Sequence, residues 1–349
     1  MILLISLHLI NIIFWFKAGA WPVGKDWYWH MHNTFKMMHA LNQNFSFKNL
    51  VFIDTAYAPL YYWTGIILVK IFSANNALFF NSAIFFTILL SAIYGLGKKL
   101  SDKQTGVLAA IICSFFAIIY TKSIQYNFNI AITALVSVCA YLLLLTNNFQ
   151  NFKFSVFAGI SFGLALLIRQ SAIIFLFGPI FTTILTCKAD NQLQNKNKFF
   201  NIFVFIFLSI FIAAIFYHCP QTLSSIMERT QHIAKVQEEN IFSLSHLFFY
   251  IKILPFQIGW LNCFLFIMSI YSLRNISPAK RLFLLSWLVI PFIILTFIRV
   301  KEFEFSMPYL PVFALCLAVF YNEISKKTTG KFLVILMIII SMCKYFISF

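Results

Sequence analysis

Two acidic residues lie in the longest polar interruption of an otherwise apolar chain. Asp26 and Asp54 belong to residues 18–63, a stretch that is also rich in Trp and Tyr. These aromatic residues favour the membrane interface because the ring is apolar and its edge is polar. A carboxylate at an interface can act as a general base or bind a cation. We therefore expect chemistry on the membrane surface where residues 18–63 lie.

Three basic residues could bind a phosphate at the same depth. Arg169 lies between two apolar segments, and Arg299 and Lys301 flank a late polar turn. An ionisable group at membrane depth is a functional hypothesis by default, and the planar fork of Arg holds phosphate oxygens in two places. The alternative for Arg169 is a side chain that reaches from a helix end to the interface. The alternative for Arg299 and Lys301 is interface anchoring, with Glu302 and Glu304 as exposed charge partners.

Histidine and cysteine do not indicate metal chemistry. His30 and His32 form an HxH pair with His39 nearby, but residues i and i+2 of a helix point to different faces. The spacing also lacks the regularity of established metal sites. The seven cysteines are scattered singly, without a CxxC pair. We expect no metal and no soluble cofactor, and the histidines could instead contact an acceptor.

The elements that must position these groups are membrane helices. The chain has 349 residues, of which 61% are hydrophobic and 10% are charged, and its mean hydropathy is +0.86. A soluble domain has about 25% charged residues. We expect an all-α integral membrane protein that forms one polytopic domain over residues 1–349. The net charge of +16 does not indicate nucleic acid, because Lys and Arg lie in short loops where they can meet lipid headgroups.

The apolar segments predict a bundle of about 11 transmembrane helices. Residues 1–16 form the first span, although the small residues after it also resemble a signal-peptide cleavage site. Residues 18–76 form a large first outer loop with juxtamembrane helices, and its segment 59–72 is short for a bilayer of about 30 Å. Residues 77–349 form the rest of the bundle, with spans near 77–96, 105–121, 128–146, 154–170, 171–187, 199–217, 247–270, 282–299, 305–322 and 331–348.

The basic loops predict the orientation. We place the loops that carry the Lys and Arg clusters in the cytoplasm. The outer side then takes residues 18–63, the late turn 299–305 and the polar segment 218–246, which is either a lid or a solvated connection. Seven of the ten acids fall on that side. This topology predicts a multi-pass protein of the inner (cytoplasmic) membrane with its site on the outer face, and it fails if residues 59–72 span the membrane.

Four motifs in this order resemble a known family. Asp26 opens the outer loop, and the loop ends in the aromatic-proline motif of residues 58–63, APLYYW. Residues 123–145 resemble the family's fourth span, residues 159–175 its Gly-Leu-Ala segment, and residues 301–311 its late segment with two prolines. Together they resemble the GT-C membrane glycosyltransferases. The closest likeness is to the family of the protein O-mannosyltransferases and the lipid A aminoarabinose transferase, which is glycosyltransferase family 39.

The resemblance implies a reaction and a division of roles. A sugar would pass, with inversion, from a polyprenyl-phosphate donor to a lipid, glycan or protein acceptor. Asp26 would be the catalytic base, and Arg169, Lys301 and Arg299 would bind the donor phosphate. The residues expected to bind substrate are Trp27, Tyr28, His30, Tyr61, Tyr62, Asn129 and Glu304.

This sequence departs from the family pattern at three positions. Trp27 stands where the family has a second acid, Asn129 where an Asp opens the fourth span, and Ala58 where relatives have a basic residue or proline. Two other functions therefore stay open. One is a transporter or lipid flippase, although no matched pair of Gly- or Pro-broken segments is evident in the two halves. The other is a non-catalytic relative that binds a lipid-linked glycan.

Overall fold

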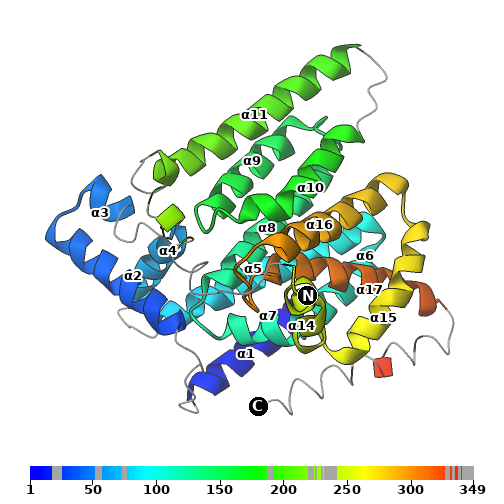
Figure 1. Cartoon of the computed structure of the whole chain (residues 1–349), viewed down its shortest axis with the longest axis horizontal. Coiled ribbons are helices and arrows are strands. Elements are labelled where there is room, and N and C mark those ends of the chain that lie inside the picture. The colour runs from blue at the N-terminus through cyan, green and yellow to red at the C-terminus, as the bar shows by residue number, and fades with distance from the viewer. Residues whose placement is uncertain are drawn as a thin grey trace.

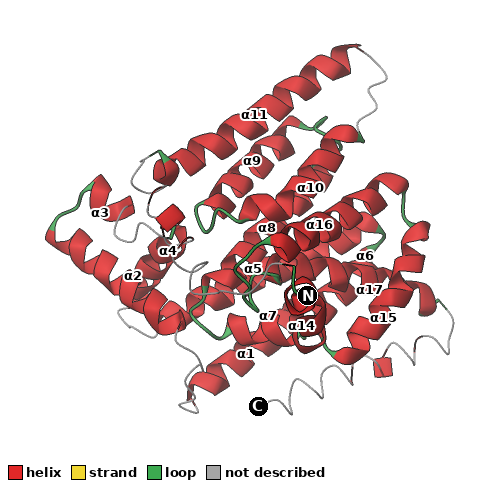
Figure 2. Cartoon of the chain, in the orientation of Figure 1, coloured by secondary structure: helices red, strands yellow, loops and turns green. Residues whose placement is uncertain are grey.

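The computed structural model describes most of the chain, and every element in the described part is helical (Figure 2). The described residues are 1–17, 26–51, 57–72, 77–186, 192–218, 224, 226–228, 231, 242–326, 331, 335–336 and 339. The expected all-α class is therefore confirmed for these residues. Asp54, most of the predicted lid 218–246 and most of the predicted last span 331–348 lie outside the described residues.

The helices follow the predicted apolar segments closely at most positions. Their bounds are α1 Ile2–Lys17, α2 Asp26–Gln43, α3 Phe47–Val51, α4 Leu60–Phe72, α5 Ala77–Leu100, α6 Lys103–Ser114, α7 Ala117–Ser123, α8 Phe128–Leu145, α9 Phe152–Leu166, α10 Ala172–Leu185, α11 Gln192–Tyr217, α13 Leu244–Leu247, α14 Phe249–Ile258, α15 Trp260–Ser272, α16 Pro278–Phe297 and α17 Leu310–Ile324, with short 3-10 turns η1 at Leu273–Asn275 and η2 at Met307–Tyr309.

The centre of the bundle is formed by α5, α8 and α17. Two-thirds of the apolar windows of α5 and α8 are buried, and 83% of that of α17, against 22% for α11 and 28% for α16. Helix α8 packs between α5 and α9, α11 covers the outer side of α9, and α16 lies along α10 (Figure 1). The poorly buried α11 exposes Phe203, Phe207 and Phe211. Such apolar faces suit a lipid environment, where exposed hydrocarbon has no cost.

The number of spans is lower than predicted within the described residues. Five helices are long and apolar enough to cross a membrane, or up to seven if each of two bent pairs is one span. The predicted count of about 11 is therefore not confirmed. Helices α1, α4, α9 and α10 are apolar but have only 13 to 16 residues. At 1.5 Å per residue, these helices are about 20–24 Å long, shorter than the hydrocarbon core.

Two predicted spans are each formed by a bent pair of helices. The predicted span 105–121 is split between α6 and α7, which meet at an angle of 72°, and the predicted span 247–270 is broken by 111° between α14 and α15. Gly259 lies at the second break with φ of +92°, a region that side chains with a Cβ rarely adopt. Pro255 precedes it within α14. The first break contains neither Gly nor Pro, so no residue at this position indicates it.

Helix α4 joins the N-terminal helices to the bundle. It packs against α2 on one side and α5 on the other. Gly65 lies at the tightest point, where an added Cβ would meet the Tyr126 hydroxyl and Leu78. The start of α4 is fixed by a backbone hydrogen bond of 3.1 Å from Leu60 N to Leu167 O. The aromatic-proline motif therefore contacts the turn that carries Arg169.

Candidate functional site

The centre of the candidate site is the carboxylate of Glu304. It forms an ion pair with Lys122 and accepts hydrogen bonds from the side-chain amides of Asn127, at 3.2 Å, and Asn129. Lys122 lies in the last turn of α7, and Glu304 lies in the turn before η2. Asn127 also caps α8, because its Oδ1 accepts from Asn129 N at 2.8 Å. The start of α8 therefore holds the side-chain amides of Asn127 and Asn129 in positions from which both donate to the Glu304 carboxylate.

Arg169 extends this network on the other side of Asn129. Its Nη1 donates to Asn129 Oδ1 at 3.4 Å. The guanidinium lies over two rings, 5.0 Å from the centroid of Phe128 and 4.4 Å from that of Phe305. These contacts are of the cation–π type and fix the plane of the guanidinium. Arg169 is half-buried in the turn between α9 and α10, so its position is determined by three separate stretches of chain.

A small cavity lies beside Arg169 and Asn129. Its volume is about 80 Å³. Ser171 and Arg169 supply polar groups, while the remaining lining is mostly apolar and comes from α8, α10, α16 and the turn around Phe305 and Pro308. A pocket with a few polar groups on an apolar wall is the usual form of a small-molecule site.

The charge balance of the network favours an anionic ligand. The side chains of Lys122 and Glu304 are only 14% and 16% exposed, so this pair largely neutralises itself in a poorly solvated place. Arg169 contributes its guanidinium to this network through Asn129. Planar Arg groups are suited to phosphate and carboxylate because two N–H groups can bind two oxygens.

Helix α2 brings Asp26 toward the same region. His30 lies edge-on to Phe128, with ring centroids 4.7 Å apart, and its Nδ1 is 3.2 Å from the Tyr62 hydroxyl. Asp26 is exposed at the first residue of α2 and lies one turn before His30. Residues i and i+4 share a helix face, so Asp26 and His30 lie on the same side of α2. Asp26, the predicted base, therefore lies one helical turn before His30, and His30 contacts Phe128, the neighbour of Asn129 in the chain.

Tyr61 and Tyr62 are buried and pack between the segments that surround the site. Tyr61 stacks on Tyr126 at 4.7 Å, and its hydroxyl is 2.8 Å from Ser82 Oγ. The Tyr126 hydroxyl is 2.8 Å from Thr34 Oγ1, which ties α2 to the segment before α8. Tyr61 and Tyr62 are 1% and 2% exposed. They position the segments around the site, and direct contact of these residues with a substrate stays a prediction, as it does for the buried His30.

The other predicted residues of α2 differ in exposure. Trp27 is half-buried and packs on Phe79, with ring centroids 5.9 Å apart, whereas Tyr28 is 60% exposed. Trp27 therefore anchors the start of α2, in the place where the family pattern has a second acid. Tyr28 remains accessible to a ligand from outside the bundle.

Lys301 and Arg299 lie in the turn that follows α16. The Lys301 ammonium donates to the carbonyls of Leu295 and, at 2.8 Å, Thr296, and so closes the C-terminal end of α16. Burial lowers the pKa of Lys301 to about 8. Arg299 is exposed. Phosphate binding by either residue stays a prediction, and the structure gives Lys301 a helix-capping contact in addition.

Sequence reasoning missed two members of the network, Lys122 and Asn127. Lys122 carried a signal, because the predicted topology places this lysine in an outer loop, against the positive-inside rule. Such an exception indicates that the charge has a specific partner. Asn127 carried no such signal, since an Asn before a helix is ordinarily only a cap.

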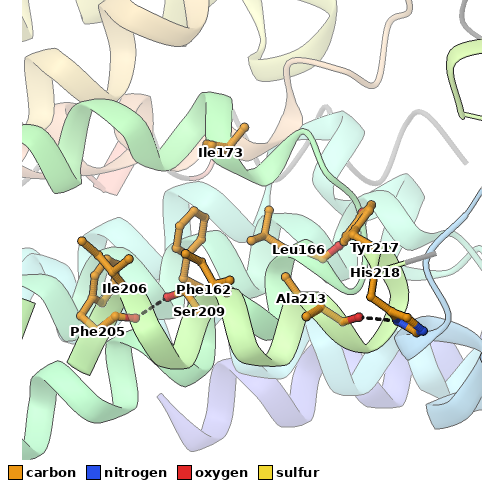
Figure 3. Close-up of a pocket in the computed structure, with 11 residues that line it drawn as sticks. Phe162, Leu166, Ile173, Phe205, Ile206, Ser209, Ala213, Tyr217 and His218 are labelled. Carbon is orange, nitrogen blue, oxygen red and sulfur yellow. Dashed lines mark hydrogen bonds between the residues drawn. The ribbon is translucent and has the colours of Figure 1, made fainter. Parts of the chain in front are cut away.

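An apolar groove ends near the Arg169 turn. It has a volume of about 380 Å³ and runs along α9, α10 and α11, from Phe205 and Ile206 at one end to Tyr217 and His218 at the other (Figure 3). The Tyr217 hydroxyl donates to Leu166 O at 3.0 Å, three residues before Arg169. Tyr217 also interacts electrostatically with the Arg169 guanidinium. A linear apolar chain in this groove would therefore have its polar end beside Arg169.

Comparison with known proteins matches one family model and several solved structures. The family model of dolichyl-phosphate-mannose-protein mannosyltransferases matches residues 56–217. The crystal structure of ArnT from Cupriavidus metallidurans in the apo state has a TM-score of 0.68 and 11% identity, covering 95% of this chain and 61% of that chain. The same protein bound to undecaprenyl phosphate gives a TM-score of 0.66 and 11% identity, covering 96% of this chain and 63% of that chain.

A third similar structure comes from an archaeon. The apo oligosaccharyltransferase from Archaeoglobus fulgidus has a TM-score of 0.60 and 16% identity, covering 91% of this chain and 50% of that chain. A search of curated protein sequences gave no significant match. The resemblance to the GT-C membrane glycosyltransferases is thereby confirmed. This chain spans about six tenths of the length of the ArnT chain it matches.

Proposed function

We propose that this protein is a glycosyltransferase of the GT-C class that uses a sugar linked to a polyprenyl phosphate. The observation that supports this most directly is the position of Arg169. It lies between a polar network and the end of an apolar groove, as a ligand with a phosphate head and a long apolar tail requires. The complex of ArnT with undecaprenyl phosphate shows that a protein of this fold binds such a lipid.

The proposed reaction needs one base and one cationic group. An acceptor hydroxyl oxygen attacks the anomeric carbon, and the bond from that carbon to the phosphate oxygen breaks, so the configuration inverts. The Asp26 carboxylate takes the hydroxyl proton. Arg169 stabilises the charge that develops on the departing polyprenyl phosphate. The acceptor is a lipid, glycan or protein, and the site is placed on the outer face of the inner membrane.

Binding of undecaprenyl phosphate to the purified full-length chain tests the role of Arg169. Native mass spectrometry in detergent would compare wild type, Arg169→Gln and Arg169→Lys. A lost charge-assisted phosphate contact of about 1.5–3 kcal/mol predicts about 10- to 100-fold weaker binding to Arg169→Gln. Arg169→Lys should fall between, because Lys keeps the charge but loses the planar fork.

Arg274→Gln is the matched control for this test. Arg274 also lies over an aromatic ring, 3.5 Å from the centroid of Tyr271, but far from α9 and the Arg169 turn in sequence and packing. Its substitution should leave binding unchanged. Equal affinity of wild type and Arg169→Gln for undecaprenyl phosphate would remove the proposed donor site.

A further inference from the structure

A second polar cavity lies at the end of the bundle opposite Arg169. Its volume is about 250 Å³. The lining comes from the C-terminal ends of α5, α8 and α10 and the N-terminal end of α16. Asn129 lies in the first turn of α8, and Leu143 and Leu144 near the end of α8 line this cavity. A helix of 18 residues is about 27 Å long, so the two sites are separated by roughly the thickness of a membrane core.

The charged groups of this cavity are all cationic. Lys99 and Lys280 line it, and among the described residues that line it none is acidic. The Lys280 ammonium donates to the carbonyls of Lys99, at 2.7 Å, and Leu100, at 3.1 Å, at the end of α5. This holds Lys280 close to Lys99. Two like charges held together are unfavourable unless a counter-charge lies between them.

The polar lining adds hydroxyl and amide groups around the two lysines. They belong to Asn147, Asn148, Thr182, Thr183 and Thr186. Asn147 and Asn148 have φ of +50° and +59°, which Asn tolerates better than most residues with a Cβ. The rim on this side is therefore a defined turn, tied to α10 by the hydrogen bond of 3.3 Å from Asn148 Nδ2 to Thr186 O.

The start of α16 completes the cavity. Ser277 and Ala279 line it, and Pro278 is the first residue of this 20-residue helix. The first N–H groups of a helix have no partner within it and carry partial positive charge. Two ammonium groups, several neutral polar groups and a helix N-terminus form a set suited to an anion with several oxygens.

We propose that this cavity binds the phosphate group of an anionic ligand at the membrane surface opposite Arg169. The ligand is either the headgroup of an anionic phospholipid or free phosphate. This site is separate from the proposed sugar-transfer site, and neither the base nor the donor phosphate contacts of that site are involved.

Thermal unfolding of the purified full-length chain in a non-ionic detergent tests the proposal. The probes are phosphatidylglycerol, inorganic phosphate, and phosphatidylcholine, whose phosphate is already balanced by its own cation. Saturating phosphatidylglycerol should raise the unfolding midpoint of wild type by about 3 °C or more, and phosphatidylcholine should not. If inorganic phosphate alone gives the same rise, the ligand is free phosphate.

Three variants locate the effect. Lys99→Gln removes one charge from the lining and should reduce the rise at least by half. Ala279→Glu adds a carboxylate to the lining, in the first turn of α16 where the helix dipole favours it, and should abolish the rise while the protein stays folded without ligand. Lys98→Gln is the matched control, because Lys98 is exposed on the same helix and does not line the cavity.

The outcomes separate this site from the transfer site. Loss of the rise in Lys99→Gln and Ala279→Glu, with undecaprenyl phosphate binding unchanged in both variants, supports the second site. An equal loss in Lys98→Gln would show that the ligand responds only to the net charge of this end, and the proposal would be withdrawn. The proposal is likewise overturned if neither phosphatidylglycerol nor inorganic phosphate distinguishes wild type from Ala279→Glu.

Discussion

Glu304 accepts a hydrogen bond from the side-chain amide of Asn129, although 175 residues separate the two along the chain. The same amide accepts from Arg169 through its oxygen. Asn129 therefore connects the carboxylate that pairs with Lys122 to the cation that we assign to the donor phosphate. An Asp at this position would bring a second negative charge beside Glu304, which an amide avoids. The Asn in place of the family's Asp thus fits the presence of Glu304.

We predict that Asp26→Asn abolishes sugar transfer without loss of folding. General base catalysis contributes about 10²–10⁴-fold to rate, and Asp26 is exposed, so its loss should not affect packing. Mass spectrometry of surface glycolipids and glycoproteins would compare cells with wild type and with Asp26→Asn at matched membrane levels. A hexose-sized or pentose-sized addition should occur with wild type alone.

Glu323→Gln is the control for Asp26→Asn. This variant also replaces a carboxylate by an amide, but near the end of α17, where the Glu323 carboxylate accepts a hydrogen bond from Asn275. Product should persist in this variant. Full product with Asp26→Asn would instead remove Asp26 as the base and show that another group takes the hydroxyl proton.

We predict that Lys122 and Glu304 depend on each other. Glu304→Leu leaves the poorly exposed Lys122 without its partner and should lower the free energy of unfolding by about 3 kcal/mol. Lys122→Met should be similarly costly, because it leaves the carboxylate with amide partners alone. The double variant Lys122→Met/Glu304→Leu should recover most of this loss. Thermal unfolding in detergent measures all three variants, and additive losses would show that the pair is not coupled.

We predict that Lys301 makes stability rise with pH above about 8. Burial lowers its pKa to about 8 from the ordinary lysine value of 10.5, so between these values the unfolded chain binds more protons than the folded chain. Stability then increases with pH across this window, and the burial cost is fully present below it. Lys301→Arg stays charged throughout and should lack this increase. The unfolding midpoints of the two proteins should therefore diverge between pH 8 and 10 and run parallel below pH 7.

We predict that Gly259→Ala destabilises the break between α14 and α15. An added Cβ would meet no atom closer than 3.8 Å, so crowding is not the cause. The backbone φ of +92° and ψ of 144° is the cause, because this region costs residues with a Cβ about 1–3 kcal/mol. Ala213→Gly, a change in the opposite direction within the straight helix α11, is the control for altered helix propensity and should cost about 1 kcal/mol. An unchanged midpoint for Gly259→Ala would mean that the break straightens without cost.

The sequence predicted the parts of the site better than their assembly. Asn129, Arg169 and Glu304 were each proposed separately, from three different motifs, and the structure brings them into one network. Lys122 was missed because its partner is remote in the chain, and no periodic pattern connects them. The break within residues 105–121 was missed because Phe115 and Phe116 are ordinary apolar residues, whereas Pro255 and Gly259 could have indicated the other break.

The span count was not confirmed for a related reason. Hydropathy reports how apolar a segment is but not how long its helix is, and α9 and α10 are strongly apolar helices of 15 and 14 residues. Their length is set instead by where the chain turns at Arg169 and by the contact of that turn with Leu60. Such turns depend on tertiary packing, which single-sequence patterns do not contain.

The wide separation of Glu304 from its partners has a consequence for biosynthesis. Glu304 is added 177 residues after Asn127, and by then the Lys122 segment has left the exit tunnel of the ribosome. During that interval the lysine has no counter-charge from this carboxylate, and α7 and the start of α8 cannot take their final places. A chain interrupted before Glu304 therefore displays a lone cation in a nascent bundle, a feature by which membrane proteases can distinguish incomplete copies from finished ones.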